Sequence, residues 1–253
     1  MIYKKSPEEL ATMREAGVLL RATLEQLEMA LHPGVTTAEL DRIADDAIVA
    51  AGAIPSFKGY RGFPASICTS PNDVIVHGIP GAHVLEEGDI ISIDVGVLYK
   101  GFHADSAWTF PVGSIEEEVS QLLKITQESL EAAIAQCLPG RRIGDVGYAV
   151  EQTAEAAGFS VVREYVGHGV GRALHEEPQV PNYGPPGRRE VLSPGMTIAI
   201  EPMVNAGGPE TRVLDDGWTV VTADGSRSAH FEHTVAVTED GHEVLTRPVS
   251  AAT

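Results

Sequence analysis

Two stretches of the chain share one pattern of hydrophobic and polar positions. Residues 31–52 and 137–158 each contain a Pro-Gly break, then apolar residues at helical spacing, and then a final Ala-Gly. A constant shift of 106 residues superimposes one stretch on the other. The pattern predicts a helix before each break, over about 8–31 and 115–138, and a second amphipathic helix that stops at the final glycine.

Strand-like segments follow each helical pair. The segment VLEEGDIISIDVGV (84–97) matches VLSPGMTIAIEPMV (191–204) with a shift of 107 residues. On this register Asp94 falls on Glu201. Two matching segments at nearly the same offset indicate an internal repeat, in which each copy contributes helices and strands.

The length of 253 residues is enough for one large domain or two small ones, with a substantial core. No Ser-rich or Pro-rich linker separates the two copies. We therefore expect a single domain, 1–253, of the α/β (α+β) class. Its two similar halves, near 1–112 and 113–253, should join their strands in one central sheet.

Two aspartates lie in strand-like segments, where an unpaired charge is expensive. Asp94 and Asp105 flank a predicted hairpin that turns at Tyr-Lys-Gly (99–101). A two-residue loop within this tripeptide gives pairs whose numbers sum to 199 or 201, and either register places both aspartates on one face. A simple three-residue loop would place them on opposite faces unless a bulge intervened. Apart from Lys100 in the turn, these strands contain no Lys or Arg. The carboxylates therefore need another source of positive charge.

Further metal-ligand candidates lie in the second half. His168 lies among the glycines of GHGVG (167–171), and Glu201 and Glu232 lie in strand-like apolar runs. Buried carboxylates and a histidine that converge on one sheet are difficult to satisfy with hydrogen bonds alone, whereas divalent cations would satisfy them. Mixed carboxylate and imidazole ligation suits Mn, Fe, Co or Zn, and more than three carboxylates indicates two ions with bridging oxygens.

Composition and charge restrict the class of partner. The formal charge is −18, with 36 acidic residues against 18 Lys plus Arg, which argues against a DNA-binding protein or a general nucleic-acid binder. No apolar run approaches the length of a membrane span, and the first residues lack the hydrophobic region of a signal peptide. The two cysteines make a disulfide framework improbable, so we expect a cytoplasmic protein.

Five motifs carry a resemblance to a known family: DVGV with GFHAD, GHGVG, LHEEPQV, IEPMVNAG and FEHTVAV. Together they resemble the type I methionine aminopeptidases of the pita-bread fold, in their short bacterial or organellar form. The resemblance covers nearly the whole chain. It implies two pseudo-symmetric halves around a central, mostly antiparallel sheet with helices on its outer face. The implied activity is removal of the N-terminal methionine from nascent proteins and peptides with a small second residue.

The resemblance also implies a role for each metal-binding side chain. Two divalent ions would be held, with Asp94 on one ion and His168 and Glu201 on the other. Asp105 and Glu232 would bridge the pair.

Other residues acquire catalytic or binding roles from the same resemblance. Glu201 would shuttle a proton, His175 in LHEEP would stabilise the developing oxyanion, and His77 in VIVHGIP would contact an amide of the substrate. Both histidines would also border the bound substrate. The remaining expected positions are a methionine pocket of Tyr60, Phe63, Cys68 and Trp218, and a monovalent cation site near Asn72, Val74 and Ser228. The implied partners are nascent polypeptide N-termini, with transient ribosome association, and the implied state is a monomer.

The segment Ser-Ala-Trp (106–108) is an atypical continuation after the bridging aspartate, and three further positions depart from the family pattern. Leu174 replaces a common aromatic, Phe57 replaces a common cysteine, and Ala104 stands where a glycine often precedes the bridging aspartate. None is a ligand, so these departures concern the shape of the pocket and not the chemistry.

Three alternative functions compete with this interpretation. A proline-specific aminopeptidase or prolidase shares the catalytic fold but usually carries an extra N-terminal domain. A non-enzymatic binding module of the same fold would have lost metal ligands, and all five are present here. A purely structural protein would leave the buried acids unexplained.

Overall fold

The computed structural model describes residues 2–247, and its four long helices form two pairs. Their bounds are α1 (Pro7–Ala30), α2 (Thr37–Ala50), α3 (Glu117–Ile134) and α4 (Ile143–Ala156). The predicted helix–break–helix pattern is thus confirmed in both copies. α3 ends four residues before the expected Leu138, and the chain continues towards Pro139 in tighter turns, in which the Gln136 and Cys137 N–H groups donate to the Ala133 and Ile134 carbonyls.

The strands form four ladders, and every pair among the described residues is antiparallel. The ladder of the first half contains β1 (Ile54–Pro55), β2 (Ile67–Pro71), β4 (Ile90–Tyr99) and β5 (Phe102–Pro111). The largest ladder of the second half contains β7 (Gly167–Gly169), β8 (Glu176–Val180), β9 (Thr197–Ile200), β14 (His233–Val237) and β15 (His242–Val244). Two small ladders and one short helix complete the fold: β6 (Ser160–Val161), β10 (Met203–Asn205), β13 (Ser228–His230); β3 (Val74–Val76), β11 (Thr211–Val213), β12 (Val220–Thr222); and the 3₁₀ helix η1 (Tyr60–Gly62).

The expected central sheet is formed by two large ladders, which join along β5 and β14 through hydrogen bonds of side-chain hydroxyls and backbone groups. Thr234 Oγ1 accepts a hydrogen bond from the Asp105 N–H at 3.0 Å and donates one to its carbonyl at 2.8 Å. Ser106 Oγ donates to the Glu232 carbonyl, and the Glu232 N–H donates to the Ala107 carbonyl. Hydroxyl groups thus satisfy backbone groups that strand pairing would otherwise satisfy. This seam brings Asp105 and Glu232, one from each half, close together.

The internal repeat is also present in the backbone pairing. Thr36 forms an isolated bridge with Val84, and Arg142 forms one with Val191. Shifts of 106 and 107 residues convert the first bridge into the second. This equivalence relates the two halves to each other, and the single domain stays a prediction.

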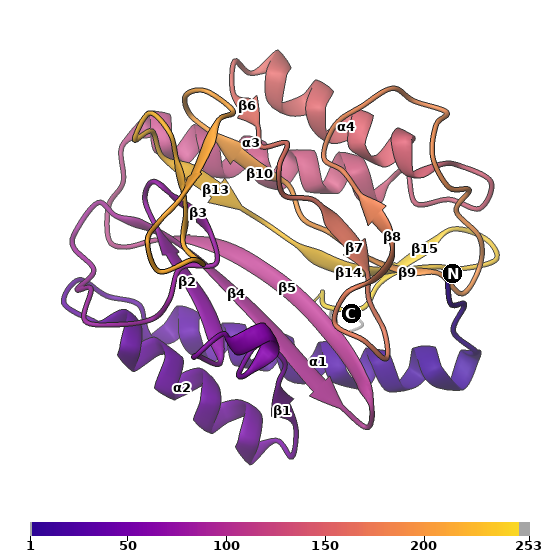
Figure 1. Cartoon of the computed structure of the whole chain (residues 1–253), viewed down its shortest axis with the longest axis horizontal. Helices are drawn as coiled ribbons and strands as arrows, with labels where there is room; N and C mark the ends of the chain where they lie inside the picture. The colour runs from indigo at the N-terminus through magenta and orange to yellow at the C-terminus, as the bar shows by residue number, and fades with distance from the viewer. Residues whose placement is uncertain (1, 248–253) are drawn as a thin grey trace, which may run out of the picture.

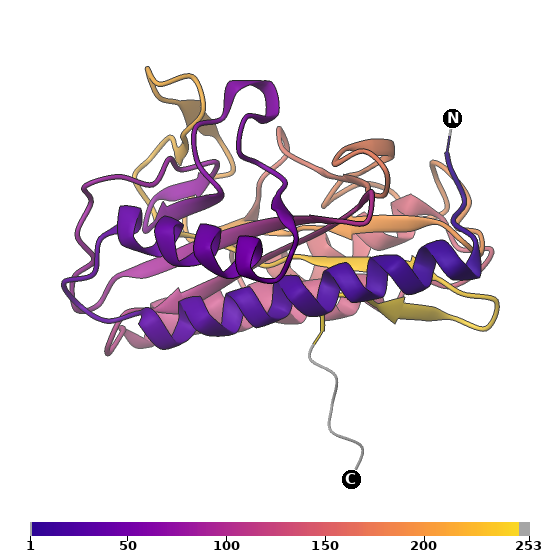
Figure 2. The ribbon, with the colours of Figure 1, turned by 90° about the horizontal axis from the view of Figure 1, so that it is seen from below.

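The helices cover one side of the strands and leave the other side to loops. α1 packs against β4 and β5, where Leu20, Leu24 and Leu27 are fully buried. α3 packs on β9, β10 and β13, and α4 packs on β6 and β8. Figure 1 shows the strands between the two helix pairs, and in Figure 2 α1 runs along one side while the loop that carries η1 projects from the other. The expected cover of helices on the outer face is confirmed, and the site lies on the loop side.

Within residues 2–247, no helix combines the length and the apolar character that crossing a membrane requires.

Candidate active site

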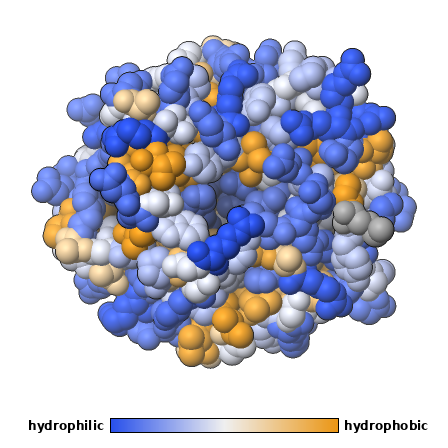
Figure 3. Space-filling view, viewed as in Figure 1, coloured by the Kyte–Doolittle hydropathy of each residue, from blue (hydrophilic) through white to orange (hydrophobic). Residues whose placement is uncertain are grey.

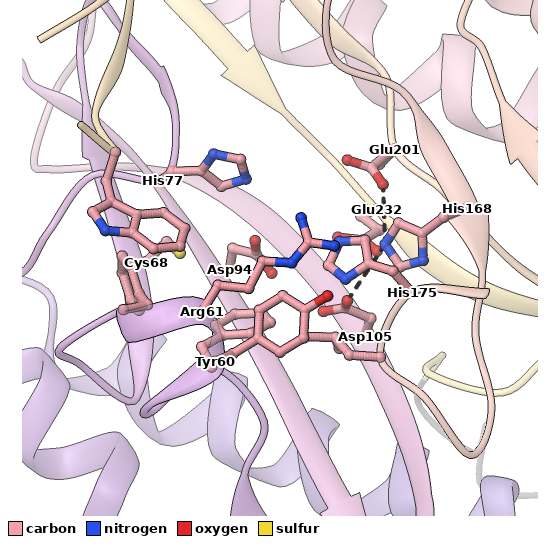
Figure 4. Close-up of a pocket in the computed structure, with 14 residues that line it drawn as sticks. Tyr60, Arg61, Cys68, His77, Asp94, Asp105, His168, His175, Glu201 and Glu232 are labelled. Carbon is pink, nitrogen blue, oxygen red and sulfur yellow. Dashed lines mark ion pairs between the residues drawn. The ribbon is translucent and has the colours of Figure 1, made fainter.

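One pocket on the loop side collects every side chain that the sequence assigned to the metal site, the catalytic histidines and the methionine pocket (Figure 4). A hollow opens near the centre of the same face in the space-filling view (Figure 3). Three further side chains line the pocket: Phe57, Arg61 and Leu174. Phe57 and Leu174 had been identified as pocket positions. Arg61 was missed, and its only sequence signal is its place beside Tyr60 in the glycine-flanked segment GYRGF.

The β4–β5 hairpin positions the two aspartates as its register predicted. Ile90 pairs with Pro111, so pair numbers sum to 201, and the two-residue loop is Lys100-Gly101. Both loop residues have positive φ, 47° and 83°, as tight hairpin turns require. On this register Asp105 lies opposite Gly96, two positions from Asp94, and both aspartates therefore share one face.

Three neighbouring strands position the ligands of the second half. His168 lies in β7, which pairs with β9. β9 pairs in turn with β14, with Ile200 opposite His233. Glu201 directly follows β9 and Glu232 directly precedes β14, so their side chains meet beside His168.

The ligand atoms converge closely. Asp105, His168 and Glu232 each offer one ligand atom, and these atoms all lie within 4.8 Å of one another. His168 Nε2 lies 3.5 Å from Glu201 Oε1 and 3.8 Å from Asp105 Oδ2 (Figure 4). His168 Nδ1 lies 2.8 Å from the Gly169 carbonyl and must carry the proton, because a carbonyl only accepts. The lone pair of Nε2 therefore faces the carboxylates, as in a metal-binding histidine.

The carboxylates are buried without compensation from basic residues. Within residues 2–247, neither Lys nor Arg forms an ion pair with any of the four acids. Asp94 Oδ1, Asp105 Oδ1 and Glu232 Oε1 are buried without a hydrogen-bond partner. Such groups are rare in native proteins and call for a ligand, an ion or water.

Burial and mutual repulsion make this cluster a strong site for cations. Burial raises the pKa of Asp94 to about 7. Burial, together with the charge of neighbouring carboxylates, raises the pKa values of Asp105, Glu201 and Glu232 well above the usual range. Burial lowers the pKa of His168 to about 3, so its imidazole is neutral and free to bind a metal. The donor set of buried carboxylates and one neutral imidazole fits divalent transition metals.

Two further histidines border the cluster. The His175 ring lies 4.1 Å from the His168 ring, centroid to centroid, and stacks on Tyr60 at 5.3 Å. His77 directly follows β3 with a positive φ of 60° and contacts Trp218 edge to face. Burial lowers the pKa of both imidazoles, that of His77 to about 4, so both are neutral near pH 7.

An apolar wall adjoins the polar cluster. Phe63 meets Trp218 edge to face at 5.1 Å, and Cys68 and Leu174 are buried beside them. Phe57 belongs to the same wall and lies so close to β4 that a Cβ at Gly96 would approach its ring to 2.7 Å. The glycine of DVGV thus makes room for the pocket wall.

The residues expected at the monovalent cation site are neighbours. The Asn72 carbonyl accepts a hydrogen bond from the Ser228 N–H at 2.9 Å, and β3 begins at Val74. The Asn72 side chain itself is engaged, because its Nδ2 donates to Asp89 and its Oδ1 accepts from Ile90. A cation at this place therefore stays a prediction, and it would have to use backbone carbonyl or hydroxyl oxygens.

Comparison with known proteins agrees with this geometry. The model of metallopeptidase family M24 matches residues 11–239. Methionine aminopeptidase 1 of Bacillus subtilis is 55% identical over 247 residues, which cover 98% of this chain and 100% of that protein. The methionine aminopeptidase of Escherichia coli K12 is 50% identical over 244 residues, which cover 96% of this chain and 92% of that protein.

Solved structures show the same similarity. Methionine aminopeptidase from Rickettsia prowazekii superimposes with a TM-score of 0.97 at 42% identity, over 98% of this chain and 100% of that one. Prolidase from Pyrococcus furiosus shares the fold with a TM-score of 0.80 at 23% identity, over 96% of this chain but 65% of the prolidase. The chain belongs to metallopeptidase family M24 and, within it, to the methionine aminopeptidases.

Proposed function

We propose that this enzyme removes the N-terminal methionine from nascent proteins and peptides whose second residue is small. One observation supports this most directly: the apolar wall and the carboxylate–histidine cluster line one pocket, and Cys68 of the wall pairs with Asp94 of the cluster across β2 and β4. A methionine side chain bound against the wall would therefore present its amide bond to the cluster.

Two divalent ions are the proposed cofactors. Asp94 would bind one ion, His168 and Glu201 would bind the other, and Asp105 and Glu232 would bridge both. Their identity lies among Mn, Fe, Co and Zn, because all four suit mixed carboxylate and imidazole ligands. When bound, such ions supply Lewis acidity, which lowers the pKa of a water and polarises a peptide carbonyl.

The chain's own groups supply proton transfer and stabilisation of charge. Glu201 would accept a proton from the attacking water and deliver it to the leaving amine. His175 would stabilise the negative charge that develops on the carbonyl oxygen. His77, on the opposite side of the pocket from His175 in Figure 4, would contact the scissile or the next amide.

The wall of Tyr60, Phe63, Cys68 and Trp218 would select methionine. Methionine is long, flexible and apolar, and its thioether makes favourable contacts with aromatic rings. Burial of this side chain should contribute roughly 1.5–3 kcal/mol. The size limit on the second residue would come from the narrow space beside the metal cluster.

A peptide panel that varies the first two residues separately tests this function. The expected result is efficient cleavage of Met-Ala-Ser, with kcat/KM lower by about tenfold or more for Ala-Ala-Ser, as the loss of methionine burial implies. Met-Lys-Ser is the matched control for the second position and should be cleaved poorly. Comparable rates for Met-Ala-Ser and Lys-Ala-Ser would indicate a general aminopeptidase. Cleavage confined to X-Pro bonds would indicate the prolidase alternative.

The biological setting follows from the proposed substrate. The partners would be the N-termini of nascent polypeptides, which the enzyme would meet during transient association with ribosomes in the cytoplasm. The enzyme would act as a monomer. We also propose the monovalent cation near Asn72, Val74 and Ser228 as a structural ion. Native mass spectrometry of the purified protein tests the monomeric state, and elemental analysis tests the monovalent cation.

A further inference from the structure

A buried ion pair links the N-terminal segment to the active-site loop. Lys5 Nζ lies 2.6 Å from Glu176 Oε2, and the two side chains are only 1% and 14% exposed. Lys5 belongs to the short segment before α1, and its backbone N–H donates to the Gly195 carbonyl at 2.8 Å. Lys5 is therefore held through both its backbone and its side chain, although it lies far from Glu176 in the sequence.

Glu176 in turn closes the loop that carries a catalytic histidine. Its Oε1 accepts a hydrogen bond from the Ala173 N–H at 3.2 Å, so one carboxylate joins the two ends of the segment around His175. The loop backbone packs directly on the ion pair. A Cβ at Gly171 would come within 2.4 Å of Lys5 Cε and 2.7 Å of Glu176 Oε1. A side chain at Gly171, the last glycine of GHGVG, would thus displace the ion pair.

A second contact supports the loop from outside. Arg172 pairs with Glu9 at 2.8 Å and lies over the Phe102 ring. Glu9 is also the acidic residue of the capping box that begins α1. This pair is at the surface, where an ion pair contributes little, whereas the buried Lys5–Glu176 pair leaves an uncompensated charge if one partner is removed.

We propose that Lys5 is a positioning residue for catalysis: its buried ion pair with Glu176 fixes the loop of residues 171–176 and with it the position of the His175 ring. The inference rests on the proposed function, in which His175 stabilises the oxyanion. Stacking on Tyr60 and contact with His168 restrain the ring on two sides. Backbone hydrogen bonds hold Gly171, which accepts from the His103 N–H and donates to the Ala173 carbonyl. The ion pair adds a restraint at the other end of the loop, because Glu176 also accepts from the Ala173 N–H. An error of about 1 Å in such a group costs up to a hundredfold in rate.

The first test compares Lys5→Met with Lys4→Met. Lys4 is the exposed neighbour and makes no ion pair among the described residues, so its variant is a matched control. Lys5→Met should lower kcat about tenfold or more. KM and bound metal, measured by elemental analysis, should stay near the wild-type values. Lys4→Met should behave as the wild type does.

A double-mutant cycle separates positioning from a general effect on stability. If Lys5 acts through His175, Lys5→Met should add no further loss of kcat to His175→Ala, because coupled residues are not additive. Glu176→Gln provides a second, milder variant that removes the charge but keeps the shape of the side chain. It should reproduce the non-additivity even if Lys5→Met folds poorly.

NMR of the histidine rings gives a readout that does not depend on activity. The ring resonances of His175, assigned from their loss in His175→Ala, should shift or broaden in Lys5→Met and stay unchanged in Lys4→Met. A wild-type kcat in Lys5→Met would overturn the proposal. So would an equal loss of kcat when Lys5→Met is introduced into the wild type and into His175→Ala. Failure of the proposed function is distinguishable, because wild-type enzyme would then not cleave Met-Ala-Ser. In that case the cycle is run on the panel's best substrate.

Discussion

Cys68 and Asp94 lie directly opposite each other on the paired strands β2 and β4. One residue belongs to the apolar wall of the pocket and the other to the carboxylate cluster. Burial first, and then the charge of Asp94, raise the pKa of the Cys68 thiol well above its usual value, so the sulfur stays protonated and acts as an apolar neighbour. One cross-strand pair therefore fixes the distance between the apolar wall and the carboxylate cluster.

Metal removal should abolish peptide hydrolysis. In the proposed mechanism the four carboxylates and His168 would hold the cations, and those cations would supply the Lewis acidity that the reaction needs. Dialysis against a chelator, followed by addition of Mn, Co or Fe, should remove and then restore cleavage of Met-Ala-Ser. Full activity in protein that elemental analysis shows to be metal-free would contradict the dinuclear hypothesis.

The stability of the metal-free protein should respond to pH through Asp94. Burial raises its pKa to about 7, so the folded protein holds a proton that the unfolded chain has lost above about pH 4. The contribution of Asp94 to the free energy of unfolding is therefore fully present below about pH 4 and is lost as the pH rises through about 7. The buried histidines act in the opposite direction.

Asp94→Asn isolates this effect, because the histidines are present in both proteins. The variant cannot ionise at position 94, so its thermal midpoint in chelator should exceed that of the wild type by a margin that grows from pH 4 to pH 8. A margin that stays constant, or one that shrinks with rising pH, would show that Asp94 has an ordinary pKa in the metal-free fold.

His175 and Glu232 should separate catalysis from metal binding. His175→Ala should keep its metal and lose about a hundredfold or more in kcat, the usual cost of removing one oxyanion stabiliser. Glu232→Gln should lower the metal content, because it removes a proposed bridging carboxylate. The measurements are elemental analysis and steady-state kinetics on the same preparations. A metal-depleted His175→Ala protein would show that the two roles are assigned wrongly.

Leu174 should set the selectivity of the pocket among apolar side chains. It is buried in the same apolar cluster as Phe57, Phe63 and Cys68. Leu174→Phe should narrow the pocket and lower kcat/KM for Leu-Ala-Ser more than for Met-Ala-Ser, changing their ratio by about tenfold. Leu174→Met, which conserves volume, is the control and should leave the ratio near its wild-type value. An unchanged ratio in Leu174→Phe would place the selectivity elsewhere.

The sequence by itself determined the local elements and their repeat. The Pro-Gly breaks divided each pair into two helices, because proline and glycine interrupt a helix in the chain beside them. The sequence left two hairpin registers, with a loop at Tyr99-Lys100 or at Lys100-Gly101, and both placed Asp94 and Asp105 on one face. The shift of 107 residues placed Glu201 at the position equivalent to Asp94. Each of these features depends on spacing along the chain.

Only the tertiary structure decided which distant residues meet. The sequence predicted that the two halves join in one sheet, but only the structure shows that hydroxyls of Ser106 and Thr234 form the join. Arg61 enters the pocket, and Lys5 reaches Glu176 across 171 positions. A lysine in a polar N-terminal segment is ordinarily exposed, and nothing in its neighbours marks it as buried. Its burial depends on the partner Glu176 and on Gly171, which lie beside Lys5 only in the folded chain.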